Sequence, residues 1–271
     1  MIFFSEEGRR VPSQEMRVFS GTPNFFYRLN MPDIQYSDVW ARLHQSGLTQ
    51  DLSALEFKRQ TEQLIDIVAA DANFANLLRG VHVPFVVSVD KQGFDLGGHL
   101  EHSLLPKLEQ AFLGEYPEYR FKAVLQGNQT LDRQLLLHPD AHYEDFIDSA
   151  MRSPVVGLFF PQALQEFDVA SQRKQMVELP ALRGANFCLA GGLDISAALI
   201  GSPSLLINER YYPPILCMSA YVHSDPRLVL MLKSYGPHLE FWCMSQMLSK
   251  DVTQVSEQWA GGLTVYMNAP N

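Results

Sequence analysis

Residues 186–222 constrain the fold of this chain more than any other stretch. The segment contains short apolar runs, which are separated by Gly191-Gly192, by Gly201-Ser-Pro203 and by Tyr211-Tyr-Pro-Pro214. Short apolar runs with turn residues between them are typical of a strand meander. We therefore predict a mostly antiparallel meander in the last third of the chain, with Gly191-Gly192 as a turn between buried strands.

The first two-thirds of the chain carries mainly helical patterns. Ser53-Ala-Leu-Glu56 predicts a capping box at the start of one helix, and Ser37 predicts the N-cap of a shorter one. Further helices are expected over residues 71–79, 99–112 (where Pro106 kinks or restarts the helix), 140–151 and 155–176. Helices early in the chain and strands late in the chain favour an α+β fold over a regular parallel α/β winding.

Two further strand regions precede the predicted meander. Residues 81–89 are β-branched and apolar, which is typical of a buried strand. Pro84 cannot donate a ladder hydrogen bond, so this strand is expected at a sheet edge or at a bulge. Residues 119–126 and 133–138 predict a strand pair across a turn at Gly127-Asn128.

The domain organisation is predicted to be simple, because no repeat and no linker-like tract divides the chain. Residues 1–30 mix aromatic side chains with glycine, proline and arginine and show no clean period. We interpret them as an N-terminal arm, followed by a single α+β domain over residues 31–271. Packing of the arm on its own domain is favoured over docking on a partner, since aromatic side chains are usually buried.

Composition excludes several classes of protein. The net charge of −9 argues against nucleic-acid binding, which needs clustered lysine and arginine. No window reaches the roughly 20 apolar residues of a membrane span, so no direct membrane insertion is expected. Three cysteines without paired spacing fit neither a disulfide framework nor a zinc knuckle, which predicts a reducing, cytoplasmic location.

Histidine supplies the sharpest chemical pattern. His99 and His102 form one pair at helix-like spacing, and His138 and His142 form another, with carboxylates between them. Imidazole and carboxylate suit zinc, iron or nickel, so the two pairs would form a metal site if they converged. Helix-cap or surface histidines are the default interpretation, and no cofactor is predicted.

Several short stretches resemble a bacterial family of unknown function, over roughly residues 55–221. They are Phe57-Lys-Arg-Gln60 with Leu64, Val83-Pro-Phe-Val-Val87, Ser153-Pro154, Phe187-Cys-Leu189 before a Gly-rich turn, and Leu205-Leu-Ile207. The resemblance implies a bacterial origin and an α+β fold. That family has no assigned activity and implies no catalytic residues. This chain also departs from it, because Pro214-Ile-Leu-Cys217 stands where the family has a Gly-x-Cys-Trp-like strand.

The absence of a catalytic motif favours a protein that works through contacts with other proteins. No nucleophile elbow and no phosphate loop occurs in the sequence. The predicted role is a non-enzymatic cytoplasmic bacterial adaptor or scaffold, with other proteins or a second copy of itself as partners. A place in a larger assembly, such as a secretion machine, extends this hypothesis without support from a motif.

The predicted interface consists of aromatic residues in two separate stretches. They are Phe25, Phe26 and Tyr27 in the arm and Tyr211 and Tyr212 in a Pro-rich turn. The alternative function is a small-molecule-binding protein or a metal-assisted enzyme that uses His99, His102, His138 and His142. Enzymatic activity therefore stays open at this point.

Overall fold

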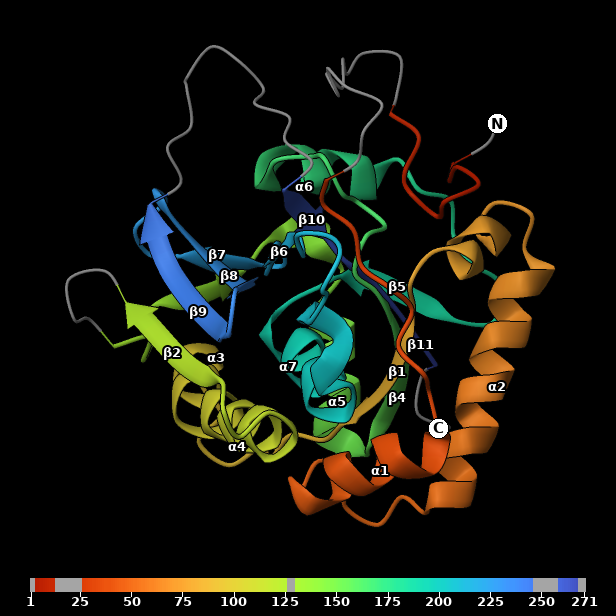
Figure 1. The fold of residues 1–271 in the computed structure, drawn as a ribbon. Helices are drawn as coiled ribbons and strands as arrows, with labels where there is room; N and C mark the ends of the chain where they lie inside the picture. The colour runs from red at the N-terminus through yellow and green to blue at the C-terminus, as the bar shows by residue number, and fades with distance from the viewer. Residues whose placement is uncertain (1–2, 13–25, 126–129, 246–257, 268–271) are drawn as a thin grey trace.

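The computed structural model describes residues 3–12, 26–125, 130–245 and 258–267 (Figure 1). The α+β prediction is confirmed, with strands concentrated toward the C-terminal part of the chain. The helices are α1 (Tyr36–Gln45), α2 (Ala54–Ala70), α3 (Leu96–His99), α4 (Leu105–Glu115), α5 (Glu144–Arg152), α6 (Val169–Val177) and α7 (Gly192–Gly201). The strands are β1 (Val83–Val87), β2 (Arg120–Leu125), β3 (Leu135–Leu137), β4 (Val155–Phe160), β5 (Asn186–Leu189), β6 (Ile215–Cys217), β7 (Tyr221–His223), β8 (Leu228–Tyr235), β9 (His238–Ser245), β10 (Trp259–Gly261) and β11 (Leu263–Tyr266).

Two larger sheets and one two-stranded ribbon organise these strands. The four-stranded sheet has the order β1-β4-β11-β5 and is antiparallel throughout. The five-stranded sheet has the order β10-β6-β8-β9-β2, and β3 pairs with β7 separately. The edge position of β1 confirms the expectation from Pro84, since an edge strand needs no donor on its outer side.

Helix α7 lies between the two larger sheets, while α2 covers the opposite face of the four-stranded sheet (Figure 1). Helix α7 packs against β1, α1 and α4, and all of its residues are buried. The predicted meander over residues 186–222 is therefore wrong at its centre, where a helix replaces a strand. A helix that is apolar on every side carries no 3.6-residue period, so its sequence resembles a buried strand.

Glycine explains why the chain can start a buried helix at Gly191-Gly192. A Cβ at Gly191 would lie 2.8 Å from ring atoms of both Tyr143 and Tyr221, and a Cβ at Gly192 would lie 2.9 Å from Tyr221. These glycines therefore let two aromatic rings close over the start of α7. The prediction of a turn between strands at this point is wrong.

Three other local predictions are corrected by the observed strands and helices. Strand β2 pairs in parallel with β9, and β3 pairs with β7, so residues 119–126 and 133–138 do not form a hairpin. Gly127 and Asn128 lie outside the described residues. The segment after Pro154 begins as strand β4, and α5 begins at Glu144 rather than at Asp140.

The π-helical turn Leu100–Leu104 connects α3 to α4 within the predicted helix over residues 99–112. Helical backbone continues without a gap from residue 96 to residue 115, so Pro106 lies inside a helical segment and cannot donate an intrahelical hydrogen bond there. The π-helical turn directly before Pro106 stands where the sequence predicts a kink or a restart. Helix α4 continues to Glu115, one residue beyond the glycine at position 114.

Replacing Ser53 with alanine is expected to lower the free energy of unfolding by about 1 kcal/mol. The Ser53 hydroxyl accepts a hydrogen bond from the Glu56 N–H at 3.2 Å at the start of α2. Ser37 is the matched control, because it is exposed and α1 begins at Tyr36 with Gln35 as its N-cap. Urea unfolding of both variants measures the difference, and equal destabilisation would contradict the capping role of Ser53.

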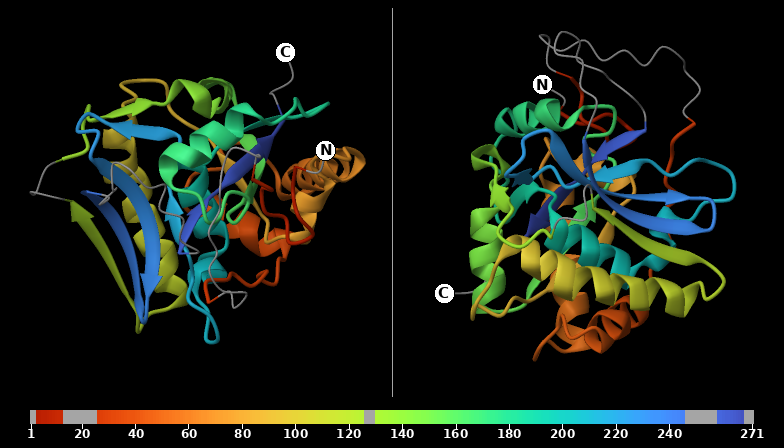
Figure 2. Two further views of the ribbon diagram at one scale, coloured as in Figure 1. Left: turned by 90° about the horizontal axis from the view of Figure 1, so that it is seen from above. Right: turned by 90° about the vertical axis from the view of Figure 1, so that its left-hand side faces the viewer.

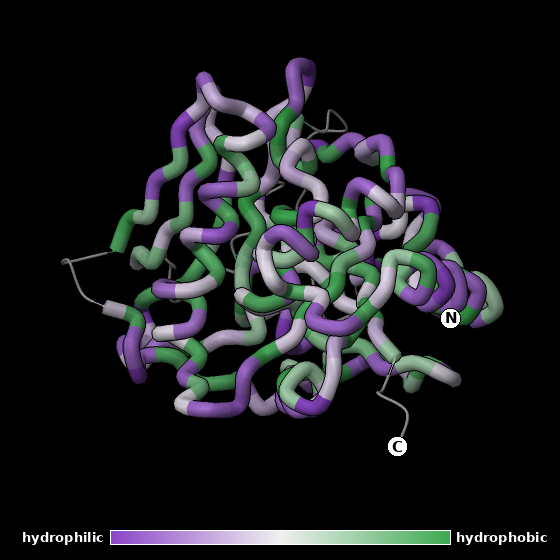
Figure 3. Tube along the Cα trace, turned by 90° about the horizontal axis from the view of Figure 1, so that it is seen from below, coloured by the Kyte–Doolittle hydropathy of each residue, from purple (hydrophilic) through white to green (hydrophobic). Residues whose placement is uncertain are grey.

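The hydrophobic core is continuous across the sheets and helices. Hydrophobic residues gather along the interior of the chain trace and hydrophilic residues along its periphery (Figure 3). Two further views show the five-stranded sheet on one side of α7 and helix α2 on the far side (Figure 2). Within the described residues, no helix combines the length and the apolarity that a bilayer crossing requires.

Candidate functional site

The structure brings the two predicted aromatic stretches together on the surface. Tyr27 forms an isolated parallel bridge with Tyr212, and their ring centroids lie 5.9 Å apart. Phe26 is 57% exposed, Tyr211 38% and Tyr212 66%. We call Phe26, Tyr27, Tyr211 and Tyr212 the aromatic surface. Residues almost 190 positions apart in the sequence thus share one site.

Backbone hydrogen bonds hold the aromatic surface in place. The Arg28 N–H donates to the Tyr212 carbonyl and the Tyr212 N–H donates to the Phe26 carbonyl, both at 3.0 Å. Gln165 donates its side-chain amide to the Tyr27 carbonyl at 3.1 Å. These bonds tie the segment to the body of the protein, so the exposed rings are presented on an ordered backbone.

Asn208 shapes the turn that carries Tyr211 and Tyr212. Its side-chain oxygen accepts hydrogen bonds from the N–H groups of Arg210 and Tyr211, at 2.9 and 3.2 Å. The Arg28 guanidinium lies 5.4 Å from the centre of the Tyr211 ring, within cation–π range. The turn is therefore fixed from inside by Asn208 and from the side by Arg28.

Of the five predicted interface residues, four form this surface. Phe25 lies outside the described residues. The sequence drew attention to both stretches through their aromatic and proline content. It carried no signal that they lie side by side, because the Tyr27–Tyr212 bridge joins distant parts of the chain.

The beginning of the N-terminal arm packs on the body of the protein. Phe4 is 1% exposed and its ring lies 5.8 Å from that of Phe74. Arg10 is also buried, and its guanidinium donates to Glu178 at 3.0 Å while its backbone N–H donates to the Ala163 carbonyl at 2.7 Å. Burial lowers the pKa of Arg10, and Glu178 opposes this shift. Residues 3–12 therefore contribute to the core.

The four predicted metal-binding histidines occupy different environments. His99 is largely buried beside Phe94, and burial, with a smaller contribution from Lys107, lowers its pKa to about 4. His138 lies next to Asp140, and His142, in a left-handed conformation, lies near Phe187. Within the described residues, these four do not assemble into one ligand cluster.

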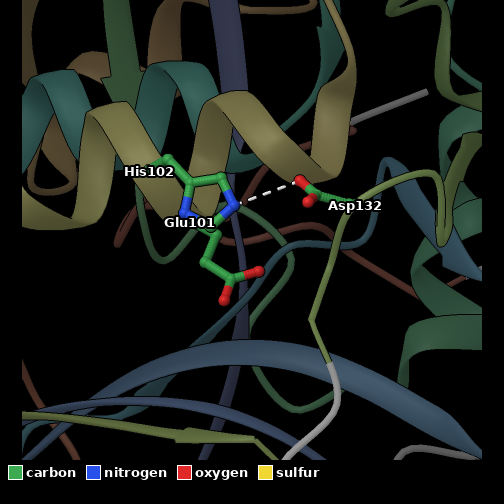
Figure 4. Close-up of side chains that lie close together, drawn as sticks. All are labelled: Glu101, His102 and Asp132. Carbon is green, nitrogen blue, oxygen red and sulfur yellow. Dashed lines mark ion pairs between the residues drawn. The ribbon is translucent and has the colours of Figure 1, made fainter.

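His102 instead meets two carboxylates. One ligand atom from each of Glu101, His102 and Asp132 lies within 4.8 Å of the other two. The Nε2 atom of His102 lies 3.2 Å from Oδ1 of Asp132. Figure 4 shows Glu101 and His102 projecting from one helical segment and Asp132 approaching from the facing turn. The sequence pattern included the carboxylate between His99 and His102, which is Glu101. It missed Asp132, because this residue belongs to a distant turn.

A buried polar network surrounds Asp194, which the sequence analysis did not single out. Its carboxylate accepts hydrogen bonds from the Tyr143 hydroxyl at 2.7 Å, from the Gly191 N–H at 2.8 Å and from the Thr264 hydroxyl. Burial raises the pKa of Asp194 to about 6, although these donors oppose the shift. Asp194 is completely buried, so this network lies in the core, where its hydrogen bonds stabilise the fold.

A surface groove lies between α2 and the start of β4. Its volume is about 580 Å³, and Leu52, Pro154 and Met267 supply apolar walls. Arg59 lies at this groove, but its guanidinium is already held by Glu56 at 2.6 Å. The positive charge of Arg59 at this groove is therefore already paired with Glu56.

The small-molecule alternative gains no catalytic arrangement from this groove. The hypothesis of a small-molecule-binding protein or metal-assisted enzyme stays a prediction. The aromatic surface is the site that the geometry defines best.

Comparison of the chain with protein-family models, with curated proteins and with solved structures finds no match. The resemblance to a bacterial family of unknown function therefore stays a prediction.

Proposed function

We propose that this protein is a non-enzymatic adaptor or scaffold that binds another protein through the aromatic surface. The observation that carries the proposal is the exposure of Phe26 and Tyr212 on two segments that backbone hydrogen bonds hold together. Tyrosine and phenylalanine are enriched at protein interfaces, where their rings bury a large area.

Preorganisation supports this function. A flexible aromatic segment would lose conformational entropy on binding, which weakens association. Here the hydrogen bonds from Gln165, Asn208 and the backbone of Tyr212 already restrict the segment before a partner arrives. More of the energy from burying the rings is therefore retained as affinity.

The polar atoms of the tyrosines add direction to the apolar area. A tyrosine presents an apolar ring and a hydroxyl that donates or accepts a hydrogen bond, so one side chain provides both area and orientation. Arg28 adds a positive charge beside Tyr211. Exposed aromatic rings beside an arginine match the composition of interface hot spots.

The proposed cytoplasmic location is supported by the state of the cysteines. Cys188, Cys217 and Cys243 are all free and buried. Burial raises the pKa of Cys217 to about 12 and that of Cys243 to about 11. Free thiols of this kind fit a reducing compartment. We further propose a bacterial origin, on the resemblance in short apolar stretches.

Replacing Tyr212 with alanine is expected to weaken partner binding by about 30-fold, the effect of losing a hot spot of roughly 2 kcal/mol. Affinity purification of the tagged chain from its native cells, with quantification of each co-purifying protein, makes the comparison. Tyr235 is the matched control, because it is a tyrosine with 72% exposure on β8. The wild type and Tyr235→Ala are expected to retain the same partner.

Two outcomes would contradict the proposal. One is an unchanged set of co-purifying proteins with Tyr212→Ala, and the other is an equal loss with Tyr235→Ala. Sedimentation of the purified chain over a range of concentrations tests self-association separately. A monomer–dimer equilibrium that Tyr212→Ala abolishes would identify a second copy as the partner.

A further inference from the structure

We propose that Glu101, His102 and Asp132 bind one divalent transition-metal ion, such as Zn²⁺. This site does not depend on the aromatic surface or on its proposed partner. It also differs from the histidine set that the sequence suggested, because only His102 belongs to both. The three ligands come from two segments that meet in the fold, the turn between α3 and α4 and residues 130–132.

The spacing of the ligand atoms fits such an ion. Zinc lies about 2.0–2.2 Å from nitrogen and oxygen ligands, so two ligands in a tetrahedral site are about 3.3–3.6 Å apart. Nε2 of His102 lies 3.2 Å from Oδ1 of Asp132, which is close to that edge length. The third ligand atom lies within 4.8 Å of both. The three ligand atoms therefore lie close to the separations that one ion requires.

The π-helical turn Leu100–Leu104 places Glu101 and His102 on the same side of the helical segment. In an α-helix, neighbouring residues diverge by about 100°, so Glu101 and His102 would point apart. The π-helical turn Leu100–Leu104 contains both residues and has more residues per turn, which narrows that angle. In Figure 4 the His102 ring reaches Asp132, and the Glu101 side chain extends from the neighbouring position of the same turn.

Two glycines let the facing turn approach the helix. A Cβ at Gly97 would lie 1.7 Å from the Leu131 carbonyl oxygen, and a Cβ at Gly98 would lie 2.6 Å from a carboxylate oxygen of Asp132. Only glycine at position 97 permits this approach of the Leu131 backbone, and a Cβ at position 98 would displace the Asp132 carboxylate. Asp132 is thereby placed within reach of His102.

Neighbouring donors orient the Glu101 carboxylate. Its Oε2 atom accepts hydrogen bonds from the Thr130 hydroxyl at 2.8 Å and from the Leu131 N–H at 2.6 Å. Such contacts behind a ligand restrict its rotation and raise metal affinity. Oε1 receives neither of these two bonds.

The chemistry of the three ligands selects the class of ion. Two carboxylates and one neutral imidazole attract a divalent cation, and the nitrogen ligand favours Zn²⁺, Co²⁺ or Ni²⁺ over Ca²⁺ and Mg²⁺. The side chain of His102 is 60% exposed and that of Asp132 is 52% exposed, so water would complete the coordination shell. The affinity is expected to fall on acidification, because the imidazole must lose its proton to bind.

Metal titration of the chelator-treated, full-length protein tests this site. The wild type is expected to bind one Co²⁺ with a visible absorption band, and Zn²⁺ is expected to displace it. His102→Ala and Asp132→Asn are each expected to weaken Co²⁺ binding by about tenfold or more, in line with the effects of altered metal shells. His138→Ala is the matched control, because this histidine also lies beside an aspartate, Asp140, at 3.9 Å.

The outcomes separate this site from other surface histidines. Retained affinity in His138→Ala, with loss in both His102→Ala and Asp132→Asn, supports the triad. Equal affinity in all four proteins, or no saturable binding by the wild type, overturns it. Circular dichroism of each variant checks folding, and both substituted side chains are more than half exposed, so the fold is expected to persist.

Discussion

Replacing Asp194 with alanine is expected to lower the free energy of unfolding by about 3–5 kcal/mol. The carboxylate receives hydrogen bonds from Tyr143, Thr264 and the Gly191 N–H, all within the protein interior. Alanine would leave these three donors buried without this acceptor. Urea unfolding followed by circular dichroism measures the loss, and a change below about 1 kcal/mol would contradict the stabilising role.

The same residue predicts a pH dependence of stability. Burial raises the pKa of Asp194 to about 6 in the folded state, above its ordinary value of 3.8 in the unfolded chain. Between these values the folded state holds more protons, so the contribution of Asp194 to stability falls as the pH rises from about 4 to about 6. Above this range the carboxylate is charged in both states, so this pH-dependent part of the stability no longer changes.

Asp194→Asn isolates this contribution, because asparagine does not titrate. The difference in unfolding free energy between wild type and Asp194→Asn is expected to change by about 1 kcal/mol from pH 5 to pH 7.5, in favour of asparagine at the higher pH. Other titrating groups contribute equally to both proteins and cancel. A difference that is constant with pH would show that the pKa of Asp194 is unchanged by folding.

Replacing Phe4 with alanine is expected to destabilise the protein by about 3–5 kcal/mol, the usual range for a buried phenylalanine. The ring is 1% exposed and packs on Phe74, whose own ring lies 5.2 Å from Phe187 in β5. The substitution leaves a cavity that reaches the core of the four-stranded sheet. A thermal or urea unfolding curve gives the magnitude.

Phe26→Ala is the control for this effect. It makes the same chemical change at a position with 57% exposure, where a stability change within about 0.5 kcal/mol is expected. Similar stability for the wild type and Phe4→Ala would show that residues 3–12 do not pack on the body. The result also decides how to test the interface. Deleting residues 1–30 would remove Phe4 and Arg10 together with Phe26 and Tyr27, so single substitutions are the better test.

The sequence predicted those elements whose signals are local. Ser53 caps α2 through a bond to a residue three positions away, and Pro84 marks an edge strand through its own missing donor. The α+β class also followed from the order of helical and strand patterns. Each of these inferences needed no knowledge of distant partners.

The remaining features depend on tertiary contacts. Helix α7 is buried on all sides, so its hydrophobic run matched a strand as well as a helix. Strands β2 and β3 pair with β9 and β7, which follow about 100 residues later in the chain. Asp132 meets His102 only because Gly97 and Gly98 allow the backbone to approach. No local sequence pattern predicts these tertiary contacts.

The position of β11 in the sheet affects how the protein can fold during synthesis on the ribosome. This strand inserts between β4 and β5, although it follows both in the chain. Translation adds roughly 5–20 residues per second. Strands β4 and β5 are therefore synthesised several seconds before the strand that pairs with both of them. During that interval each offers an unpaired backbone edge to neighbouring chains. Added chaperones should therefore raise the yield of folded protein more than changes to the exposed surface.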